Sequence, residues 1–403
     1  MSSLDSSSAT PLASDAAARV LKSSLESCSG GVLASQHLRK AIAARYIATS
    51  STDEIPGSNI QPASLDLRLG DVAYRVRCSF LPGSATVEHA MKSHVIDEQD
   101  LRGQGAVLET NRPYLVPLKE RLSLPDFIRA KANPKSSTGR VDVFTRVITD
   151  HSDRFDEIAH GYAGPLWVEV VPLSFPIRIS EGLALNQLRL ATGSPELADA
   201  ELSELHQRQP LLFARGAPVP VDQLFLANGM YLTLDLRGNA SRDVGYRSRD
   251  YAPLLDLTLK SPVDPEPYWE KVRSGEQNRV VLTPKRFHLL MSNEAVSVPP
   301  SLAAEMAAYD PTSGELRTHY AGFFDPGFGY DPVNAIHGSR AALEVRAHDV
   351  PFMIESGQRV CKLTFERMIE PPETLYGEAI GSSYQQQEET LSKHFQAQHR
   401  AVS

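Results

Sequence analysis

The sequence has few cysteines, and none is placed to form a disulfide framework. Cys28, Cys78 and Cys361 are odd in number and far apart in a chain of 403 residues. Small secreted folds held together by disulfides are therefore excluded. We expect free thiols in a reducing compartment, and hence a cytoplasmic protein.

Long apolar runs and an excess of positive charge are also missing. No segment approaches the roughly 20 apolar residues that a membrane helix needs. The formal net charge of −8 lacks the basic footprint of a dedicated nucleic-acid-binding protein. Local lysines and arginines can still bind a polyanionic ligand against this acidic background. A chain of this length, with 41% hydrophobic and 22% charged residues, is typical of a globular protein with two domains.

The N-terminal segment is rich in Ser and Ala and has no basic stretch followed by an apolar one. A secretory signal is therefore not expected. We expect residues 1–30 to form a disordered tail, with room for a short helix at 16–25.

The rest of the chain repeats itself at a nearly constant spacing. The string LWVEV at 166–170 corresponds to AALEV at 341–345, which puts Glu169 opposite Glu344. The same offset pairs Gly139 with Gly314, Asp150 with Asp325, Pro176 with Pro351 and Leu188 with Leu363, in a list too long for chance. A duplication is the simplest explanation. It predicts a first repeat at 31–208, a linker at 209–220, a second repeat at 221–372 and a C-terminal closing tail at 373–403.

Both repeats have the character of β-strands. Short runs rich in Val, Ile, Leu and Tyr alternate with Gly, Pro, Asp and Ser. Helical patterns are confined to 35–46, 195–209 and 388–398. We therefore expect a mainly β protein of two tandem, distorted β-barrel or jelly-roll-like modules with a few short helices. An all-β sandwich without nucleotide chemistry is the alternative.

Four stretches resemble one family in the order in which that family carries them. They are IQPASLDLRLG at 60–70, KSSTGR at 135–140, HYAGFFDPGF at 319–328 and the tail YGEAIGSSYQQQEETLSKHF at 376–395. Together they resemble the dCTP deaminase branch of the dUTPase superfamily, and more closely its long tandem bacterial form. The resemblance implies dUTPase-like modules and hydrolytic deamination of dCTP to dUTP and ammonia, which feeds thymidylate synthesis.

The resemblance implies a carboxylate as general base and acid. Deamination of cytosine needs a water that attacks C4, a group that takes its proton and a proton for the departing ammonia. Zinc-dependent deaminases activate this water with a metal held by His-x-Glu and Pro-Cys-x-x-Cys motifs, which are missing here. By position after the nucleoside loop, the matching glutamates are Glu344 and, in the first repeat, Glu169. Partial burial between apolar strand residues would raise the pKa of such a glutamate.

The KSSTGR string has the residue types that anion and water handling requires. Ser136 and Ser137 supply hydroxyls, Gly139 permits a tight backbone path, and Lys135 and Arg140 supply positive charge. By resemblance, Ser136 orients the attacking water, Arg140 lies beside the catalytic glutamate, and Lys135 and Ser137 hold phosphate. The family has Arg where this chain has Lys135, and a lysine cannot form the two-pronged contact of a guanidinium.

The loop AGFFDPGF is expected to receive the nucleoside. Asp325 can accept a hydrogen bond from the 3′-hydroxyl, and Phe323 or Phe324 can pack under the sugar and disfavour a 2′-hydroxyl. Ala321 and Gly322 complete the loop.

The C-terminal tail resembles a segment that closes over bound nucleotide. Tyr376, Tyr384 and Gln387 align with family residues that contact it. Ser383 replaces a common lysine, which puts one phosphate contact in doubt.

The repeats have degenerated in complementary ways. The first repeat keeps STGR at 137–140, whereas the second has TSGE at 312–315, where Glu315 would repel phosphate. The second repeat keeps AGFFDPGF, whereas the first has lost its turn-forming Pro and Gly. We therefore expect one composite site, with the phosphate turn from the first repeat and the nucleoside loop, Glu344 and tail from the second.

The alternatives at this point are a bifunctional enzyme that converts dCTP to dUMP and a non-catalytic nucleotide-binding regulator. Mg²⁺ is expected to arrive with the triphosphate, bound by phosphate oxygens and water rather than by protein ligands. We expect a homo-oligomer, a trimer or a dimer, with no nucleic-acid or membrane partner. Inhibition by dTTP stays open.

Overall fold

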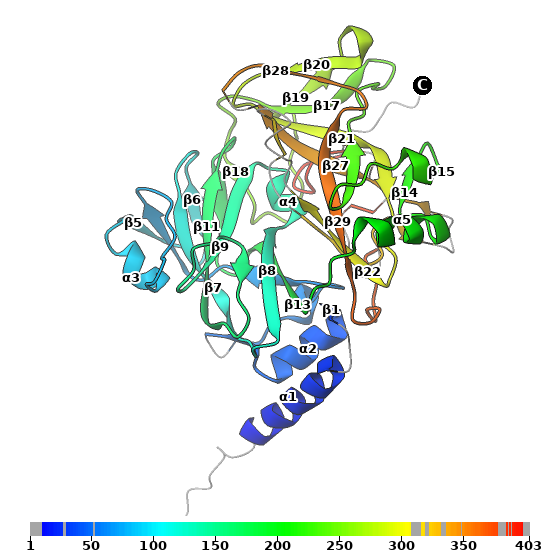
Figure 1. Ribbon diagram of the computed structural model, residues 1–403. Coiled ribbons are helices and arrows are strands. Elements are labelled where there is room, and N and C mark those ends of the chain that lie inside the picture. The colour runs from blue at the N-terminus through cyan, green and yellow to red at the C-terminus, as the bar shows by residue number, and fades with distance from the viewer. Residues whose placement is uncertain are drawn as a thin grey trace, which may run out of the picture.

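A computed structural model of the chain describes residues 10–26, 30–50, 53–307, 316–318, 322–331, 336–347, 349–377, 384–385, 387 and 389–397. It is a mainly β structure in which two units lie against each other, with the short helix α4 (Ser136–Gly139) near their junction (Figure 1). The other helices are α1 (Thr10–Glu26), α2 (Ser35–Ala43), α3 (Val87–Met91) and α5 (Asp199–Arg208).

The described residues of the first unit form thirteen strands. They are β1 (Gly31–Val32), β2 (Ile47–Thr49), β3 (Leu65–Arg68), β4 (Val72–Val76), β5 (Val95–Asp100), β6 (Ala106–Leu108), β7 (Tyr114–Ser123), β8 (Ile128–Pro134), β9 (Val143–Thr149), β10 (Glu157–Ile158), β11 (Ala163–Pro172), β12 (Ile177–Ile179) and β13 (Ala184–Thr192). One sheet has the order β1-β13-β8-β10 with β3 paired to β13, and another has the order β5-β4-β7-β11-β9 with β2 paired to β7.

The second unit begins with α5, not at the predicted residue 221, because Leu202 of this helix is buried in the core of the second unit. Its strands are β14 (Leu212–Ala214), β15 (Ala217–Pro218), β16 (Met230–Thr233), β17 (Asp243–Ser248), β18 (Leu255–Asp256), β19 (Trp269–Arg273), β20 (Arg279–Leu282), β21 (Phe287–Val296), β22 (Leu302–Ala307), β23 (Leu316–Thr318), β24 (Phe323–Phe324), β25 (Tyr330–Asp331), β26 (Ile336–His337), β27 (Ser339–Ala347), β28 (Phe352–Glu355) and β29 (Arg359–Arg367).

The two units share a pattern of strand pairing. In the first, β13 lies between β3 and β8, and β11 lies between β7 and β9. In the second, β29 lies between β16 and β22, and β27 lies between β21 and β23. Glu169 on β11 and Glu344 on β27 therefore occupy equivalent strands. The predicted fold class, two tandem dUTPase-like modules, is confirmed.

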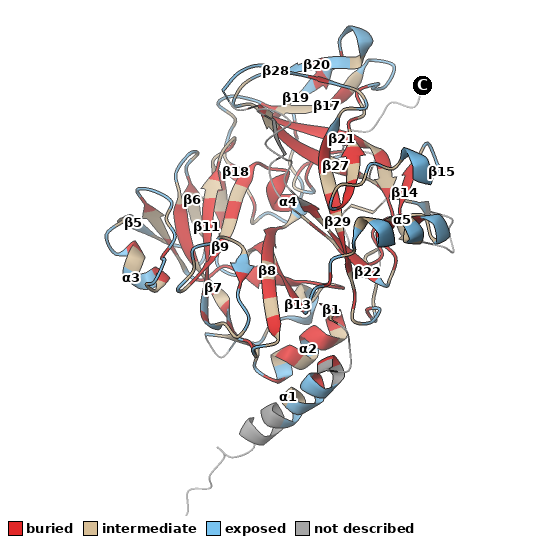
Figure 2. Cartoon of the chain, viewed as in Figure 1, coloured by how far each residue is buried: buried red, intermediate tan, exposed pale blue. Residues whose placement is uncertain are grey.

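The units are interlocked rather than joined end to end. Strand β18 of the second unit pairs in parallel with β12 of the first, with Ile177 opposite Leu255. Tyr268 and Trp269 pack edge-on against Phe175, with ring centroids 5.4 and 5.2 Å apart. Figure 2 shows that buried residues continue along the strands of both units. Such a junction fixes the relative position of side chains from the two units.

The short helix expected at 16–25 lies within α1, and of the three later helix predictions two are right and one is wrong. Helix α2 lies within the predicted 35–46, and α5 within 195–209. The described residues 389–397 are not helical. Leu391 and Phe395 have the four-residue spacing of a helix face, but both are buried in the core of the first unit. The backbone there forms a bridge to Val263 instead, because burial of these two side chains outweighs local helix propensity.

Two predicted boundaries also need correction. Residues 10–26 of the expected disordered tail form α1, whose Leu21 and Leu25 are buried in the core of the first unit. The expected linker at 209–220 contains β14 and β15, and Leu212 pairs with Val296 of β21. This stretch is therefore part of the second unit. No helix in the described part of the chain is long and apolar enough to cross a membrane.

Candidate active site

A cavity of about 260 Å³ lies where the two units meet. The first unit lines it with Gln61, Asp66, Pro134, Lys135, Ser136, Ser137, Arg140 and Gln187. The second unit contributes Met306, Gly322, Phe323, Phe324, Asp325, Phe328, Ala341, Ala342 and Glu344, and the tail contributes Tyr376, Tyr384, Gln387 and Lys393. The composite arrangement predicted from the degenerate repeats is therefore present within a single chain.

The phosphate motif forms a tight turn at the end of β8. Lys135 precedes α4 in an extended conformation, and its N–H donates to the carbonyl of Leu185 at 2.9 Å. The Lys135 ammonium forms an ion pair with the Asp66 carboxylate, which also accepts a hydrogen bond from Gln187 Nε2 at 3.0 Å. Much of the charge of Lys135 is thus compensated within the protein.

Glu344 faces this turn from β27. A side chain at Gly139 would place its Cβ 2.5 Å from Glu344 Oε2, so any larger residue there would displace the Glu344 carboxylate. Burial raises the pKa of Glu344 well above its usual range, the positive charge of Arg140 opposes this rise, and Asp142 adds to it. A carboxyl group with a pKa raised in this way holds a proton more readily than an exposed glutamate does.

Glu169, the equivalent residue of the first unit, lies outside the cavity. Its Oε1 is 2.6 Å from Arg146 Nη2, and the Arg146 guanidinium stacks over Phe155 at 3.6 Å. Glu169 is therefore held in a structural ion pair, and Glu344 is the glutamate of the pair that reaches the cavity.

Arg140 joins the turn to the tail. Its Nη2 donates to Gln387 Oε1 at 2.6 Å, and its guanidinium lies 3.7 Å from the centroid of the Tyr384 ring. Gln387 Nε2 in turn donates to the carbonyl of Arg340 at 2.5 Å. These contacts join the tail to the turn of the first unit and to β27 of the second.

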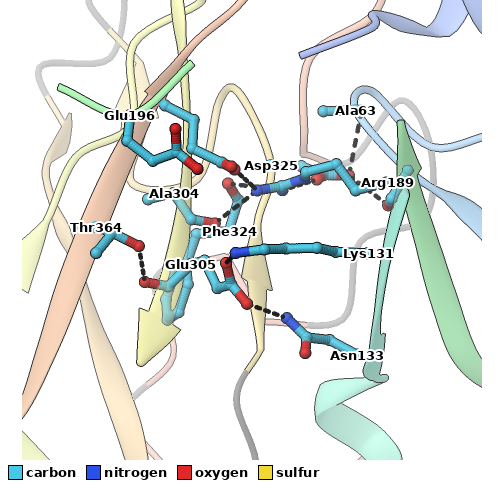
Figure 3. A network of polar contacts seen from close by, with 12 residues as sticks. Ala63, Lys131, Asn133, Arg189, Glu196, Ala304, Glu305, Phe324, Asp325 and Thr364 are labelled. Carbon is cyan, nitrogen blue, oxygen red and sulfur yellow. Dashed lines mark hydrogen bonds and ion pairs between the residues drawn. The ribbon is translucent and has the colours of Figure 1, made fainter. Parts of the chain in front are cut away.

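Asp325 is fixed by a buried ion-pair network (Figure 3). Its Oδ1 is 2.8 Å from Arg189 Nη2, and its Oδ2 accepts a hydrogen bond from Ser64 Oγ at 3.1 Å. Arg189 is itself only 2% exposed and also pairs with Glu366 at 2.8 Å. The first unit thus orients the carboxylate of the nucleoside loop.

The aromatic side chains of the loop line the same cavity. Phe324 packs edge-on against Phe328, with ring centroids 4.9 Å apart, and Phe328 contacts Tyr376. Burial raises the pKa of the Tyr376 phenol. Gly327 has a φ of +103°, and a Cβ there would lie 2.7 Å from the Tyr376 amide nitrogen, so the turn requires glycine.

Most of the predicted site residues are brought together in this cavity. Gly139 touches Glu344 without lining the cavity wall. Ala321 and Ser383 lie outside the described residues. Sequence reasoning missed Asp66, Gln187, Arg189 and Lys393 as site residues. For Asp66 a signal existed, since it lies in the family-like string at 60–70.

Among the residues that the structure describes, no group of three or more His, Cys, Asp or Glu side chains is arranged to hold a metal ion.

The fold and the cavity together define the class of protein to which this chain belongs. Two dUTPase-like units line one cavity, to which the first contributes a Ser-Ser-Thr-Gly-Arg turn and the second a buried glutamate and the loop that contains Asp325. Residues 29–194 match the 2′-deoxycytidine 5′-triphosphate deaminase N-terminal domain, and residues 198–395 match the C-terminal domain of the same family. The chain belongs to the 2′-deoxycytidine 5′-triphosphate deaminase family.

Individual relatives agree with this assignment. The crystal structure of 2′-deoxycytidine 5′-triphosphate deaminase from Agrobacterium tumefaciens is 43% identical, with a TM-score of 0.77, over 86% of this chain and 100% of that one. The dCTP deaminase, dUMP-forming, of Methanobrevibacter smithii is 31% identical over 33% of this chain and 69% of its own length. The dCTP deaminase of Natronomonas pharaonis is 26% identical over 39% of this chain and 78% of its own length.

Proposed function

We propose that the protein hydrolyses dCTP to dUTP and ammonia, with Glu344 as general base and then general acid. The observation that carries the proposal is the position of Glu344, buried at the unit junction and in contact with the Gly139 turn. Membership of the dCTP deaminase family supports the substrate.

A single carboxylate, that of Glu344, is proposed to carry out all the proton transfers. Ionised Glu344 takes a proton from water as the water oxygen bonds to C4 of the cytosine ring. Glu344 gives this proton to ring N3, then takes the proton of the new C4 hydroxyl and passes it to the amino group; the C4–N bond breaks, ammonia leaves and the C4 carbonyl forms. The raised pKa of Glu344 suits both halves of this cycle, because the carboxyl must accept and release a proton at similar cost.

The neighbouring residues are proposed to position the reactants. Ser136 orients the water, and the Arg140 charge stabilises ionised Glu344 and limits the rise of its pKa. Asp325 accepts a hydrogen bond from the 3′-hydroxyl, while Phe324 packs against the sugar. Lys135 and Ser137 face the phosphates.

Magnesium is proposed to accompany the triphosphate. Lys135 and Lys393 line the cavity beside hydroxyl groups, a donor set that suits phosphate oxygens rather than a metal ion directly. Bound Mg²⁺ would neutralise part of the phosphate charge. We also propose a cytoplasmic homo-oligomer, with dTTP as a candidate inhibitor.

A bifunctional reaction is the second candidate. The Methanobrevibacter smithii relative is named a dUMP-forming dCTP deaminase, whereas the Natronomonas pharaonis relative is named a dCTP deaminase. For the dUMP-forming reaction, a second water must attack the α-phosphate, and Asp325 is the carboxylate of the nucleoside loop that is available to orient it.

The deciding experiment separates the products formed from dCTP and Mg²⁺, with and without a zinc chelator. We expect dUTP and ammonia in both conditions; dUMP would identify the bifunctional enzyme, and binding without ammonia release would identify a regulator. Inhibition by the chelator would contradict the zinc-free mechanism.

A matched pair of variants tests the assignment of the glutamate. Glu344→Gln keeps the shape but cannot cycle the proton, and should reduce kcat by about 10²- to 10⁴-fold. Glu169→Gln should retain turnover, because Glu169 lies outside the cavity. The opposite pattern would transfer the role to Glu169, and full activity of both variants would exclude the mechanism.

A further inference from the structure

A buried ion pair joins the phosphate turn of the first unit to β27, the strand that carries Glu344. Asp142, three residues after Gly139, is fully buried and pairs with Arg346. The Asp142 carboxylate also accepts a hydrogen bond from Ser174 Oγ. Neither Asp142 nor Arg346 lines the cavity between the units. The pair therefore supports the site from outside the cavity wall.

The backbone at Asp142 has a conformation that glycine adopts more easily than aspartate. Its φ is +57°, in the left-handed region, where aspartate is tolerated at a cost. The turn closes here, because the N–H of Asp142 donates to the carbonyl of Gly139 at 2.8 Å. A glycine would suit this backbone but would lack the carboxylate that pairs with Arg346. The ion pair accounts for an aspartate at this position.

Glu344 and Arg346 project from the same face of β27. Side chains two positions apart on a strand point to the same side of its sheet. Both meet the turn, since a Cβ at Gly139 would touch the Glu344 carboxylate and Asp142 pairs with Arg346. Phe287, opposite Arg346 on β21, is buried in the core of the first unit. The strand thus contacts the turn at two points, one of which is Glu344.

The equivalent strand of the first unit has no such pair. Two positions after the aligned glutamate, β27 has Arg346, whereas β11 has Val171, which cannot form an ion pair. Glu169 of β11 is held directly by Arg146 instead. An arginine two positions further on therefore accompanies only the glutamate that reaches the cavity.

The charge of Asp142 acts on Glu344. Burial raises the pKa of Glu344, the Arg140 charge opposes this rise, and the Asp142 charge adds to it. Arg346 compensates part of the Asp142 charge, so the electrostatic potential at Glu344 depends on both members of the pair. The charged groups that bear on Glu344 are thus Arg140 and Asp142 of the turn, with Arg346 of β27 compensating Asp142.

We propose that Asp142, held by Arg346, is a positioning residue for the deamination: the pair fixes β27 against the turn and keeps a negative charge beside Glu344. This proposal rests on the proposed function, in which Glu344 moves the protons. Since the pair lies outside the cavity wall, it acts through Glu344 and not on the substrate. Its loss should change turnover and the pH dependence of turnover, and leave KM for dCTP nearly unchanged.

Two variants that change the charge in opposite directions test the proposal. The pH at which kcat/KM for dCTP rises on the acidic side reports the ionisation of Glu344 in the free enzyme. Asp142→Asn keeps the shape, removes the negative charge and leaves Arg346 unpaired, so this rise should move to lower pH by about one unit. Arg346→Gln leaves the Asp142 charge uncompensated, and the rise should move to higher pH. Both variants should reduce kcat about 10- to 100-fold, with KM changed less than about twofold.

Opposite shifts support the proposal, because a pair that only held the fold together would reduce kcat and stability without separating the two pH profiles. Unmoved profiles, or profiles that move in the same direction, overturn it. Arg346→Lys keeps the positive charge and should restore the wild-type profile. Glu120→Gln is the control, since Glu120 is a fully buried carboxylate 2.7 Å from Arg68 that does not line the cavity. Its loss should lower stability without moving the profile.

Direct titration separates this proposal from the proposed function. NMR of the full chain with carbon-labelled glutamate follows the Glu344 carboxyl, which is assigned by its absence in Glu344→Gln. If wild type released no ammonia and Asp142→Asn still lowered the pKa of this carboxyl, the deaminase function would fail and the role of the pair would stand. Ammonia release with an unchanged titration overturns the role of the pair. Should Asp142→Asn fail to fold, Arg346→Gln, at a side chain that is 14% exposed, takes its place, and an unmoved titration then overturns the proposal.

Discussion

Arg189 on β13 of the first unit donates to Asp325 in the nucleoside loop of the second, with 2.8 Å between Nη2 and Oδ1. The arginine is 2% exposed and the aspartate 6% exposed. Arg189 also holds Glu366 and donates to the carbonyl of Ala304 at 3.0 Å. The buried Arg189 therefore forms ion pairs with two buried carboxylates, those of Asp325 and Glu366, and Asp325 lines the cavity between the units.

Removal of this cation should cost both stability and substrate recognition. Arg189→Ala leaves Asp325 and Glu366 buried without their cation, which should lower the free energy of unfolding by about 3–5 kcal/mol. Asp325 would also lose its orientation, so KM for dCTP should rise. Urea denaturation and steady-state kinetics measure the two effects.

A partly exposed arginine, Arg129, provides the control, because its side chain is 22% exposed. Arg129 pairs with Glu196 at 2.9 Å, but this glutamate side chain is 44% exposed. Arg129→Ala should change the free energy of unfolding by less than about 1 kcal/mol. Equal losses in the two variants would mean that the buried network contributes no more than a surface ion pair.

The site should not be complemented between chains. Arg140 and Glu344 line the same cavity of one chain. In a mixture of Arg140→Ala and Glu344→Gln chains, every site carries one defect, and ammonia release should stay at the level of the separate variants. Wild type mixed with either variant should give activity in proportion to its share. Recovery in the double-variant mixture would show that the working site forms between chains.

Much of this architecture follows from the sequence. The constant offset that pairs Glu169 with Glu344 predicts two equivalent units, and their strands are equivalent in the structure. The loss of Arg at Glu315 and of the Pro-Gly turn in the first repeat predicts one composite cavity. These features could be predicted because each motif is a short string of consecutive residues, so its chemistry can be recognised in the sequence itself.

The features of the fold and the site that could not be predicted depend on contacts between residues that are distant in the sequence. Nothing local distinguishes Arg189 from a surface arginine, since its partners lie 136 and 177 positions away. The spacing of Leu391 and Phe395 suits a helix face, but tertiary burial turns that segment into an anchor. The same anchor positions Lys393, which therefore escaped prediction.

Asp156 should make stability depend on pH. Burial raises its pKa to about 7, against the opposing effects of the Val147 N–H and the Arg146 charge. The unfolded state releases this proton near pH 4 while the folded state keeps it, so the free energy of unfolding should fall as pH rises from about 4 to 7. Asp156→Asn keeps an acceptor for the Val147 N–H and should be more stable than wild type at pH 8, by a few kcal/mol at most, and equal to it near pH 4.

Urea denaturation at several pH values measures this difference. Asp126→Asn, at an exposed carboxylate, is the matched control and should leave the pH profile unchanged. A constant difference between Asp156→Asn and wild type at all pH values would show that Asp156 is not the titrating group.

Phe395 tests whether the end of the tail is an anchor or a mobile flap. Its ring is 5% exposed and lies 5.2 Å from the ring centroid of Tyr268. Phe395→Ala should lower the free energy of unfolding by about 3–5 kcal/mol, as for other buried aromatic residues. Because Lys393 precedes this anchor by two residues, KM for dCTP should rise as well.

The control is Phe225, which is 42% exposed although it packs edge-on against Tyr231 at 5.1 Å. Phe225→Ala should destabilise the protein much less and leave KM unchanged, because little apolar surface is removed from water there. A flap that opens freely would give a different result: Phe395→Ala would then leave unfolding unaffected and alter KM alone. A loss of stability together with a raised KM would establish that residues 391–396 belong to the core and position Lys393 at the cavity wall.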